Sequence, residues 1–557
     1  YYIDGMRVYG SNTLPQSAIE QVEVILGGTP ASYGDATGGI ISVTTRGPSR
    51  AFTGGIDMQT SKYLDPYGYY RVGVNATGPL FSKKDTVTKT KTPVMGYFLA
   101  GDFTFNEDGA PTPNGIYKGK DDYVDYISQT PLRLTPDGQG IYMNAEFMTK
   151  DDMEKVKTTM NSSNYNFAVS GKLDFRLSST INLSFGGTFS SYNNNNFGYG
   201  NSMLNWDKNS HSTGYTWRVN GRFTQRFPTT NEKAFVKNVN YSIGADFTRN
   251  YSKFEDADHK DDLFKYGYVG KFETHTIRAY TPTLEYDTVS QKYAHIQNGF
   301  RDTLVTFTPS TINPESSNWT EQYYELFPEA EGNYTNLDEI LAGRGLLNGM
   351  QPYTVYSLYN SPGTRPNNPG YQVSSSDQVS VNATFAADFG NHEIQLGLQY
   401  QQRSSGFYNY NPVDLWPIMR QVTNAQLYEL DVANPILVYR DGAFMDTINY
   451  HRKYVPVLQR NFDINLRQKL GLPTDGLDYI DIDSYDFTSN SINYYDADQN
   501  LHTIYANSEI FSIDMFNADE LLNNGDPVVG YRGYDYKGNK LTSKPSFEDF
   551  FYAVDEK

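Results

Sequence analysis

Nine segments of the chain alternate between apolar and polar residues with a period of two, which is the pattern of β-strands. In the sixth segment, for example, Trp217 and Val219 alternate with Arg218. The segments are residues 52–59, 70–77, 97–105, 165–175, 181–189, 215–224, 239–247, 379–389 and 394–400. All run longer than the roughly 5–6 residues of soluble strands, and a tilted strand needs about 9–11 residues to cross a bilayer. The pattern therefore predicts antiparallel membrane-spanning strands that are apolar toward lipid and polar inside.

The links between these segments alternate in length. Short links occupy residues 79–93, 177–180, 228–236 and 390–392, and long links occupy residues 106–163, 193–212 and 251–376. Only the link after the first segment is short where a long one is allowed. Short turns on one side and long loops on the other are typical of outer-membrane barrels, whose long loops face outside the cell. We therefore predict an all-β transmembrane barrel, with its first nine strands and their long extracellular loops in residues 49–406.

Residues 407–557 show no convincing continuation of the barrel. They contain a helix-like piece at residues 461–472 and a strand-like piece at residues 500–511, and a structureless loop of this length would be unusual. We predict a long, folded extracellular loop. Because open sheet edges are not tolerated in lipid, we expect the remaining strands to lie outside this sequence, so that the chain is a partial one.

Residues 1–48 have a different pattern of apolar and polar residues from the predicted barrel strands. Two short apolar runs, residues 22–26 and 40–44, flank a stretch crowded with Gly, Ala, Ser and Asp. This pattern favours a small sheet with tight turns, and the residues predicted for its core are Val22, Val24, Ile40 and Val43. A nucleotide-binding loop is disfavoured, since no Gly-Lys-Ser/Thr or GxGxxG motif follows a strand and opens a helix.

The segments "YIDGMRV", "IEQVEVILGG" and "YGDATGGIISVTTRG" carry a dense set of motif positions. They resemble the C-terminal half of the plug domain of TonB-dependent outer-membrane transporters, most closely the large Bacteroidota-type members with a plug and a 22-strand barrel. The motif positions are Asp4, Gly5, Glu20, Glu23, Gly27, Tyr33, Gly34, Gly38 and Gly39. One departure is that Leu26-Gly27-Gly28 stand where the family often has Arg-Gly-Pro, which removes a basic residue that could pair with the barrel.

The resemblance implies a small α+β plug inside the barrel and energised uptake through it. It implies contact with outer-membrane lipids and with a TonB-type inner-membrane energy transducer, which would pull a segment N-terminal to this sequence. Large outer loops leave an oligosaccharide or a peptide as the favoured cargo, with siderophores and cobalamin open. The alternative is a barrel subunit of a surface or secretion assembly, whose long loops bind partners such as a surface lipoprotein.

The composition of the chain argues against several classes of function. A net charge of −18 argues against a nucleic-acid partner, and the absence of cysteine excludes thiol catalysis and Cys-type zinc sites. The seven histidines are scattered and no nucleophile elbow appears, so the sequence predicts no enzyme, cofactor or metal site. Acidic stretches at residues 255–262, 478–486 and 496–500 lack EF-hand spacing, and solvated loop charge is the favoured interpretation.

Strand parity places a set of charged residues on the luminal face. The main candidates are Arg71, Arg218, Arg222, Asp57, Asp102, Asp246, Asp388 and Glu393, joined by Lys172, Asp174 and Arg176. They either hold the plug and line the solute path or are merely solvated or paired with one another. Arg7, Arg46 and Arg50 are possible plug-side partners for the carboxylates. The first interpretation predicts that removing Asp246 and Asp388 together loosens the plug.

Overall fold

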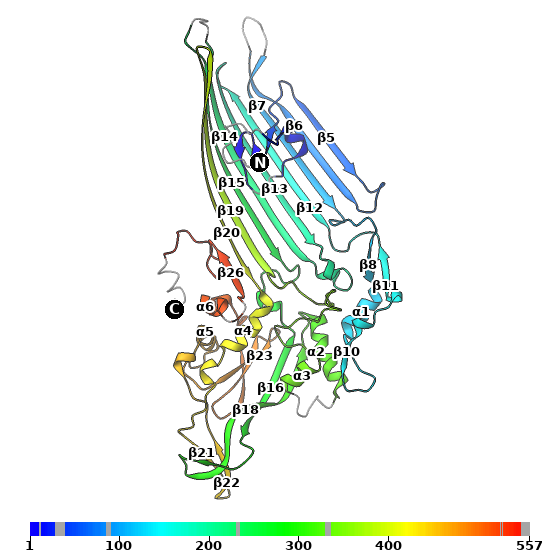
Figure 1. Ribbon diagram of the computed structural model, residues 1–557, viewed down its shortest axis with the longest axis vertical. Helices are drawn as coiled ribbons and strands as arrows, with labels where there is room; N and C mark the ends of the chain where they lie inside the picture. Colours follow the sequence, from blue (N-terminus) through cyan, green and yellow to red (C-terminus); the bar gives the residue numbers. More distant parts are fainter. Residues whose placement is uncertain are drawn as a thin grey trace.

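Ten antiparallel strands form one open, tilted wall in the computed structural model (Figure 1), which describes residues 1–9, 13–27, 39–84, 91–229, 234–328, 336–523, 525 and 527–546. The strand order is β26-β20-β19-β15-β14-β13-β12-β7-β6-β5. The strands are β5 (Thr53–Thr60), β6 (Tyr69–Lys84), β7 (Lys91–Asn106), β12 (Asn164–Arg176), β13 (Ile181–Asn196), β14 (Ser210–Phe227), β15 (Val236–Glu255), β19 (Tyr371–Phe389), β20 (His392–Tyr410) and β26 (Val529–Arg532). The predicted fold class and all nine predicted strands are confirmed.

Several strands are longer than the sequence pattern suggested. β13 runs to Asn196 and β14 begins at Ser210, so both ends of the expected loop at residues 193–212 are strand and only residues 197–209 connect them. Beyond the lipid both faces of the wall are polar, so the alternation disappears while the backbone hydrogen bonds continue. The wall also has a tenth strand, since the four residues of β26 pair with the end of β20. The prediction that no wall strand follows residue 407 was therefore wrong, because four residues are too few to show a period of two.

The outer face of the wall is apolar and uncovered. Val219 is 50% exposed and Leu398 is 67% exposed, although both lie in the middle of regular strands. Near the ends of the strands that carry the long loops, Phe189, Tyr215 and Tyr251 form a row, with ring centroids 6.4 and 5.2 Å apart. An apolar band with an aromatic girdle is what a lipid-facing barrel surface requires. Within the described residues, no helix is both long and apolar enough to cross a membrane.

The plug is a four-stranded sheet that lies against the luminal face of the wall (Figure 1). Its strands are β1 (Tyr2–Ile3), β2 (Met6–Arg7), β3 (Ile19–Ile25) and β4 (Ile40–Thr45), in the order β2-β1-β4-β3, with a short 3-10 turn, η1, at Gln16–Ala18. Asp4 and Gly5 form the two-residue turn of the β1–β2 hairpin with φ of 51° and 73°, the geometry that a type I′ turn needs. The Asp4 carboxylate accepts hydrogen bonds from the Thr45 backbone N–H at 2.8 Å and the Thr45 hydroxyl at 2.6 Å, which ties the hairpin to β4.

The core of the plug differs from the predicted one. Ile40 and Val43 are buried as expected, but Val22 and Val24 are 52% and 55% exposed. β3 is the edge strand of its sheet and, among the described strands, pairs only with β4, so five of its seven residues stay exposed. The buried apolar residues instead come from the hairpin and the turn before β3: Tyr2, Ile3, Met6, Val8 and Ala18.

The long loops fold together into an assembly beyond the wall, at the lower end of Figure 1. Its helices are α1 (Asp121–Gln129), α2 (Pro314–Leu326), α3 (Leu337–Ala342), α4 (Leu415–Val422), α5 (Asn461–Leu470) and α6 (Ala518–Leu522). Its strands are β8 (Ile116–Gly119), β9 (Leu132–Leu134), β10 (Ile141–Met143), β11 (Met153–Val156), β16 (Gly270–Tyr280), β17 (Glu285–Asp287), β18 (Lys292–Pro309), β21 (Ile436–Arg440), β22 (Ala443–Asn449), β23 (Tyr479–Asp486), β24 (Ser491–Tyr495) and β25 (Leu501–Tyr505). The helix-like and strand-like pieces predicted after residue 407 are confirmed as α5 and β25.

One apolar core joins segments of this assembly that are far apart in the sequence. Trp416 and Phe462 are fully buried and pack with Tyr268, Tyr485 and Phe511. The last loop therefore shares its core with the loop between β15 and β19, and the two cannot fold independently.

Two acidic stretches of the assembly are not solvated loop charge. Asp256 is buried and lies 3.1 Å from the guanidinium of Arg365, and Asp483 is buried and lies 2.6 Å from that of Arg420. Buried charges persist only when they are paired, so these carboxylates hold loops together. The third stretch fits a solvated turn, where hydrogen bonds from His502 and Asn500 lower the pKa of Asp496.

The hairpin turn gives a first test. Gly5→Ala places a methyl carbon 3.2 Å from Nη2 of Arg222 at a positive φ, whereas Gly138→Ala has a similar φ of 69° with no atom within 4 Å. Alanine in this conformation costs roughly 1–2 kcal/mol at either site. We expect only Gly5→Ala to speed protease cleavage within residues 1–48 of the detergent-purified protein. Equal cleavage rates for the two variants would contradict the close fit between hairpin and wall.

Candidate functional site

The β1–β2 hairpin of the plug is held by side chains of the wall that donate hydrogen bonds to its backbone carbonyls. Arg218 Nη2 donates to the Ile3 carbonyl at 3.3 Å, and Arg222 Nη2 donates to the Asp4 carbonyl. The remaining donors are amides: Asn382 to the Gly5 carbonyl at 3.2 Å, and Gln378 and Gln401 to the Arg7 carbonyl at 2.9 and 3.3 Å. The wall thereby supplies hydrogen-bond donors to the Asp4 and Gly5 carbonyls of the turn and to the Ile3 and Arg7 carbonyls beside it, as buried backbone groups require.

Strand geometry brings these donors together. Arg218 and Arg222 are four residues apart on β14, as Gln378 and Asn382 are on β19, and residues two or four apart on a strand share a face. Gln401 on β20 lies opposite Ser380 of β19, so it joins the same face. We call these five side chains the hairpin cradle.

One cradle arginine carries its own counter-ion. Arg218 and Asp246 are in direct contact, with side chains 2% and 0% exposed, and the Thr248 hydroxyl donates to Asp246 at 3.2 Å. A guanidinium buried this deeply needs a paired anion, since breaking a buried pair leaves an uncompensated charge. Asp246 therefore allows Arg218 to reach the plug in a buried position.

A second anchor has the opposite polarity. Arg71 lies 2.9 Å from Asp102 and 3.1 Å from Asp57, and Asp102 accepts the backbone N–H of Gln16 at 2.8 Å. Gln16 opens η1, where Ala18 packs against the wall. Here a wall carboxylate holds a plug donor, while at the hairpin wall donors hold plug carbonyls.

The charged candidates fall into two groups. Arg71, Arg218, Arg222, Asp57, Asp102 and Asp246 belong to the two anchors, and Lys172 Nζ reaches the Thr45 hydroxyl at 3.5 Å. Asp388 and Glu393 lie instead at the short-turn end of β19 and β20, where Asn238 donates to Asp388 at 2.7 Å and Gln395 donates to Glu393 at 3.0 Å. The hypothesis that pairs Asp388 with Asp246 therefore joins two residues in different surroundings. Among the described residues, Arg7, Arg46 and Arg50 form no ion pair with a carboxylate.

The plug motif residues also separate. Asp4 and Gly5 form the hairpin turn, while Glu20, Glu23 and Gly27 are exposed on or after β3. Gly39 has a φ of 113°, and a Cβ there would lie 2.9 Å from the Ile25 carbonyl. Gly28, Tyr33, Gly34 and Gly38 lie outside the described residues. The three amides of the cradle carry no charge and were not predicted from the sequence, although strand parity already places Gln378 and Asn382 on one face of β19.

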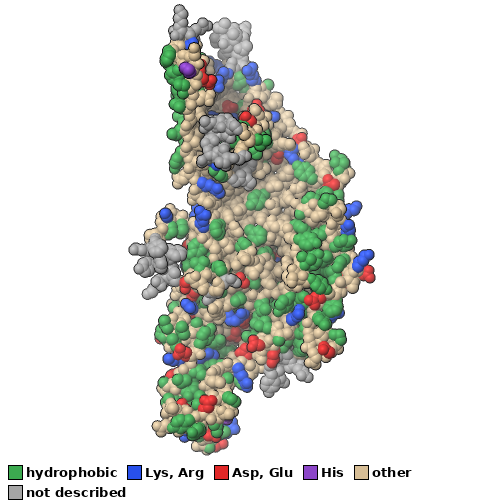
Figure 2. Space-filling model, viewed as in Figure 1, with side chains coloured by type: hydrophobic (Ala, Val, Ile, Leu, Met, Phe, Trp, Pro, Cys, Tyr) green, Lys and Arg blue, Asp and Glu red, His purple; other side chains and the backbone are tan. Residues whose placement is uncertain are grey.

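Beyond the hairpin, toward the long loops, the luminal face has a recess of about 370 Å³. In Figure 2 the surface between the plug and the outer assembly is mostly tan, with scattered hydrophobic and charged side chains. The lining residues are Tyr192, Thr216, Asn250, Tyr251, Ser252, Ser374, Ser375, Ser376, Arg403, Ser405, Gly406, Phe407 and Arg532. The recess thus combines hydroxyls, aromatic rings and two guanidiniums on the side of the plug that faces the outer loops.

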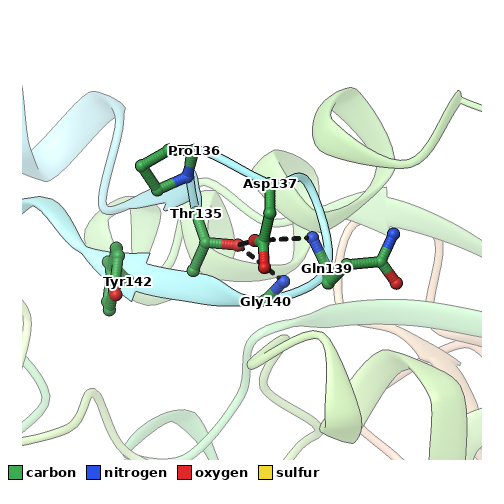
Figure 3. A pocket seen from close by; sticks show the side chains of 6 residues that line it. All are labelled: Thr135, Pro136, Asp137, Gln139, Gly140 and Tyr142. Atoms are coloured by element: carbon green, nitrogen blue, oxygen red, sulfur yellow. Dashed lines mark hydrogen bonds between the residues drawn. The ribbon is translucent and has the colours of Figure 1, made fainter.

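A larger hollow of about 480 Å³ lies in the outer assembly at the turn between β9 and β10 (Figure 3). Its polar atoms bond to one another: Asp137 accepts the Thr135 hydroxyl and, at 3.2 Å, the Gln139 N–H, and Gly140 N–H donates to the Thr135 hydroxyl at 2.8 Å. These bonds hold the pKa of Asp137 below its usual value. The hollow is therefore a satisfied turn. Among the described residues, no three His, Asp or Glu side chains converge on a possible metal position.

Comparisons with known proteins give the following. No family model matches the chain. The probable TonB-dependent siderophore receptor PirA of Acinetobacter baumannii is 34% identical over 100 residues, which are 17% of this chain and 12% of that protein. The crystal structure of the siderophore receptor PiuA from Acinetobacter baumannii aligns at 12% identity with a TM-score of 0.29 over 73% of this chain and 50% of that chain. The closed form of the ferric-catecholate import receptor Fiu from E. coli K12 aligns at 12% identity with a TM-score of 0.32, over 73% of this chain and 49% of that chain. The chain spans about half the length of these solved receptors and a smaller share of the curated relative.

The buried pair in the cradle gives a second test. Arg218→Gln leaves the buried Asp246 carboxylate without its counter-ion. Breaking a buried ion pair in this way lowers the free energy of unfolding by about 3–5 kcal/mol. We expect cells that carry this variant to become more sensitive to vancomycin, a large antibiotic that a seated plug excludes. The double variant Arg218→Gln with Asp246→Asn also removes the unpaired carboxylate, so we expect it to restore part of the resistance to vancomycin.

Asp388→Asn is the control, because it removes a single charge from the luminal face away from the plug and makes the same change as Asp246→Asn. Equal sensitivity in the Asp388→Asn and Arg218→Gln strains would show that the cradle does not hold the plug.

Proposed function

Since this chain belongs to the TonB-dependent receptor family of outer-membrane proteins, we propose that it supplies the plug and part of the wall of a receptor for energised uptake. Residues 1–48 are the plug part, residues 49–406 together with β26 are the wall and its loops, and the rest of residues 407–557 is the outer assembly. The apolar outer face contacts outer-membrane lipids. A TonB-type energy transducer of the inner membrane displaces the plug.

The hairpin cradle is the observation that carries this proposal. It orients the plug through directional hydrogen bonds, which add to apolar contacts such as those of Ala18 with Phe98 and Ala100. An intramolecular hydrogen bond contributes about 0.5–1.5 kcal/mol net, because water replaces the lost partner. A plug held this way is well oriented, yet it can be released in steps when force is applied.

We propose that the cargo is a bulky polar solute such as an oligosaccharide or a peptide. The polar recess above the hairpin and the aromatic residues in and near it support this cargo, because such surfaces bind polar groups and stack on rings. The relative PirA of Acinetobacter baumannii is a probable siderophore receptor, so a siderophore is the alternative cargo.

A second candidate role is that of a partner-binding subunit of a surface assembly. The outer assembly supports it, since its shared core makes a rigid platform far larger than a simple loop cover. A surface lipoprotein is the partner that we propose for it. Both roles leave the protein a receptor or scaffold and not an enzyme.

Deletion of the energy transducer separates the two roles. For an energised receptor we expect cells to lose uptake of an oligosaccharide mixture to the level of a strain without this protein, while the outer membrane keeps its normal amount of the protein. A scaffold would keep co-purifying with its partner in fixed ratio, and uptake would be indifferent to the deletion. The measurement is solute depletion from the medium, with the protein quantified in membrane fractions.

A further inference from the structure

The luminal recess carries positive charge that no residue described by the structure neutralises. Arg403 on β20 and Arg532 on β26 both line it. Among the described residues neither guanidinium forms an ion pair, whereas Arg71, Arg218 and Arg365 all do. This is unexpected in a chain with a net charge of −18, in which carboxylates outnumber basic groups.

The two guanidiniums share one face of the wall. Arg403 lies two residues from the cradle residue Gln401, and Arg532 lies opposite Phe407 in the β20–β26 ladder. Residues 401, 403, 405 and 407 alternate onto the luminal side, and Arg532 is paired with Phe407, so both arginines project from the luminal face. The nearby carboxylate of Asp377 lies on the opposite face, where Arg249 and Lys540 pair with it at 2.6 and 2.9 Å.

Arg403 also reaches the plug. Its guanidinium carbon lies 5.3 Å from the centre of the Tyr9 ring, and that of Arg7 lies 4.9 Å from the same ring. The Arg403 Nε donates to the Ser376 hydroxyl at 3.1 Å, which fixes the side chain between the recess and the plug. A second basic group, Arg7, therefore faces the same aromatic ring.

The rest of the lining is rich in hydroxyls. Ser252, Ser374, Ser376 and Ser405 contribute both donors and acceptors, and Asn250 adds an amide. Guanidinium forks bind carboxylate and sulfate groups through paired N–H donors, and hydroxyl walls match a solute that carries many hydroxyls. The ring of Phe407 offers a surface for the apolar face of a sugar ring.

From this geometry we infer that the recess selects a solute with an anionic group on a polyhydroxylated frame, an acidic oligosaccharide, which Arg403 and Arg532 bind. The inference rests on the proposed role of this face as the solute path. The inference goes beyond that role because it specifies the charge of the cargo and the two residues that bind the charged group.

The test compares tri-galacturonate with its methyl ester, which keeps the sugar and removes the charge, by calorimetry on the detergent-purified protein. Charge-assisted hydrogen bonds contribute more than neutral ones, so we expect the acid to bind at least about tenfold more tightly than the ester. Arg403→Gln and Arg532→Gln should each reduce this ratio, and the preference should weaken as sodium chloride is raised.

Arg176→Gln is the matched control, because it removes the same charge from the luminal face of β12, at the short-turn end and away from the recess. It should leave the ratio unchanged. Arg403→Lys keeps the charge without the fork and should retain part of the preference, which separates charge recognition from misfolding. Equal binding of acid and ester, binding of neither, or an acid preference that survives both glutamine variants would overturn the inference.

This experiment needs no energy transducer, so its failure is distinct from failure of the proposed function. A charge preference without transducer-dependent uptake would leave the inference standing and remove the proposed transport. Transducer-dependent uptake without any charge preference would do the reverse.

Discussion

The hydrogen bonds from the wall to the carbonyls of the β1–β2 hairpin are the interaction on which the rest of this structure depends. A hairpin turn leaves carbonyls without strand partners, and a hairpin pressed against a wall cannot give them all to water. The wall supplies donors at the matching spacing because residues four apart on β14 and on β19 share its luminal face. The Asp246 carboxylate is needed in turn, since it makes the buried Arg218 tolerable.

This constraint explains why the interior of the wall is polar while its exterior is apolar. A plug seated by apolar packing would be fixed by contact area, whereas one seated by hydrogen bonds is fixed by direction and can exchange its partners for water. The type I′ turn at Asp4 and Gly5 presents the carbonyls in a defined geometry, and the bonds between Asp4 and Thr45 keep that turn attached to the plug sheet. The hairpin and β4 are thereby connected by side-chain as well as backbone hydrogen bonds.

The sequence predicts the wall well because a period of two and the sorting of loop lengths both follow from a lipid face and two aqueous ends. It predicts less where that cause is absent. The strand ends at Asn196 and Ser210 lie outside lipid and lose the alternation, and β26 is too short to show one. Val22 and Val24 look like core residues in sequence, but burial depends on what covers an edge strand. The amides of the cradle carry no charge, so their role becomes visible only when their distances to the hairpin carbonyls are known.

The ion pairs of the luminal face are distributed unevenly between the level of the plug and the level of the long loops. At the level of the plug, Arg71 and Arg218 are each matched to carboxylates, so the site holds backbone groups without attracting ions. Toward the long loops, Arg403 and Arg532 form no ion pair within the part of the chain that the structure describes, so no described carboxylate cancels their field there. Because Gln401 and Arg403 are two residues apart on β20, the group that holds the Arg7 carbonyl and the group that faces the recess belong to one rigid strand. A ligand that draws Arg403 away from Tyr9 therefore acts on the same stretch of wall that seats the hairpin.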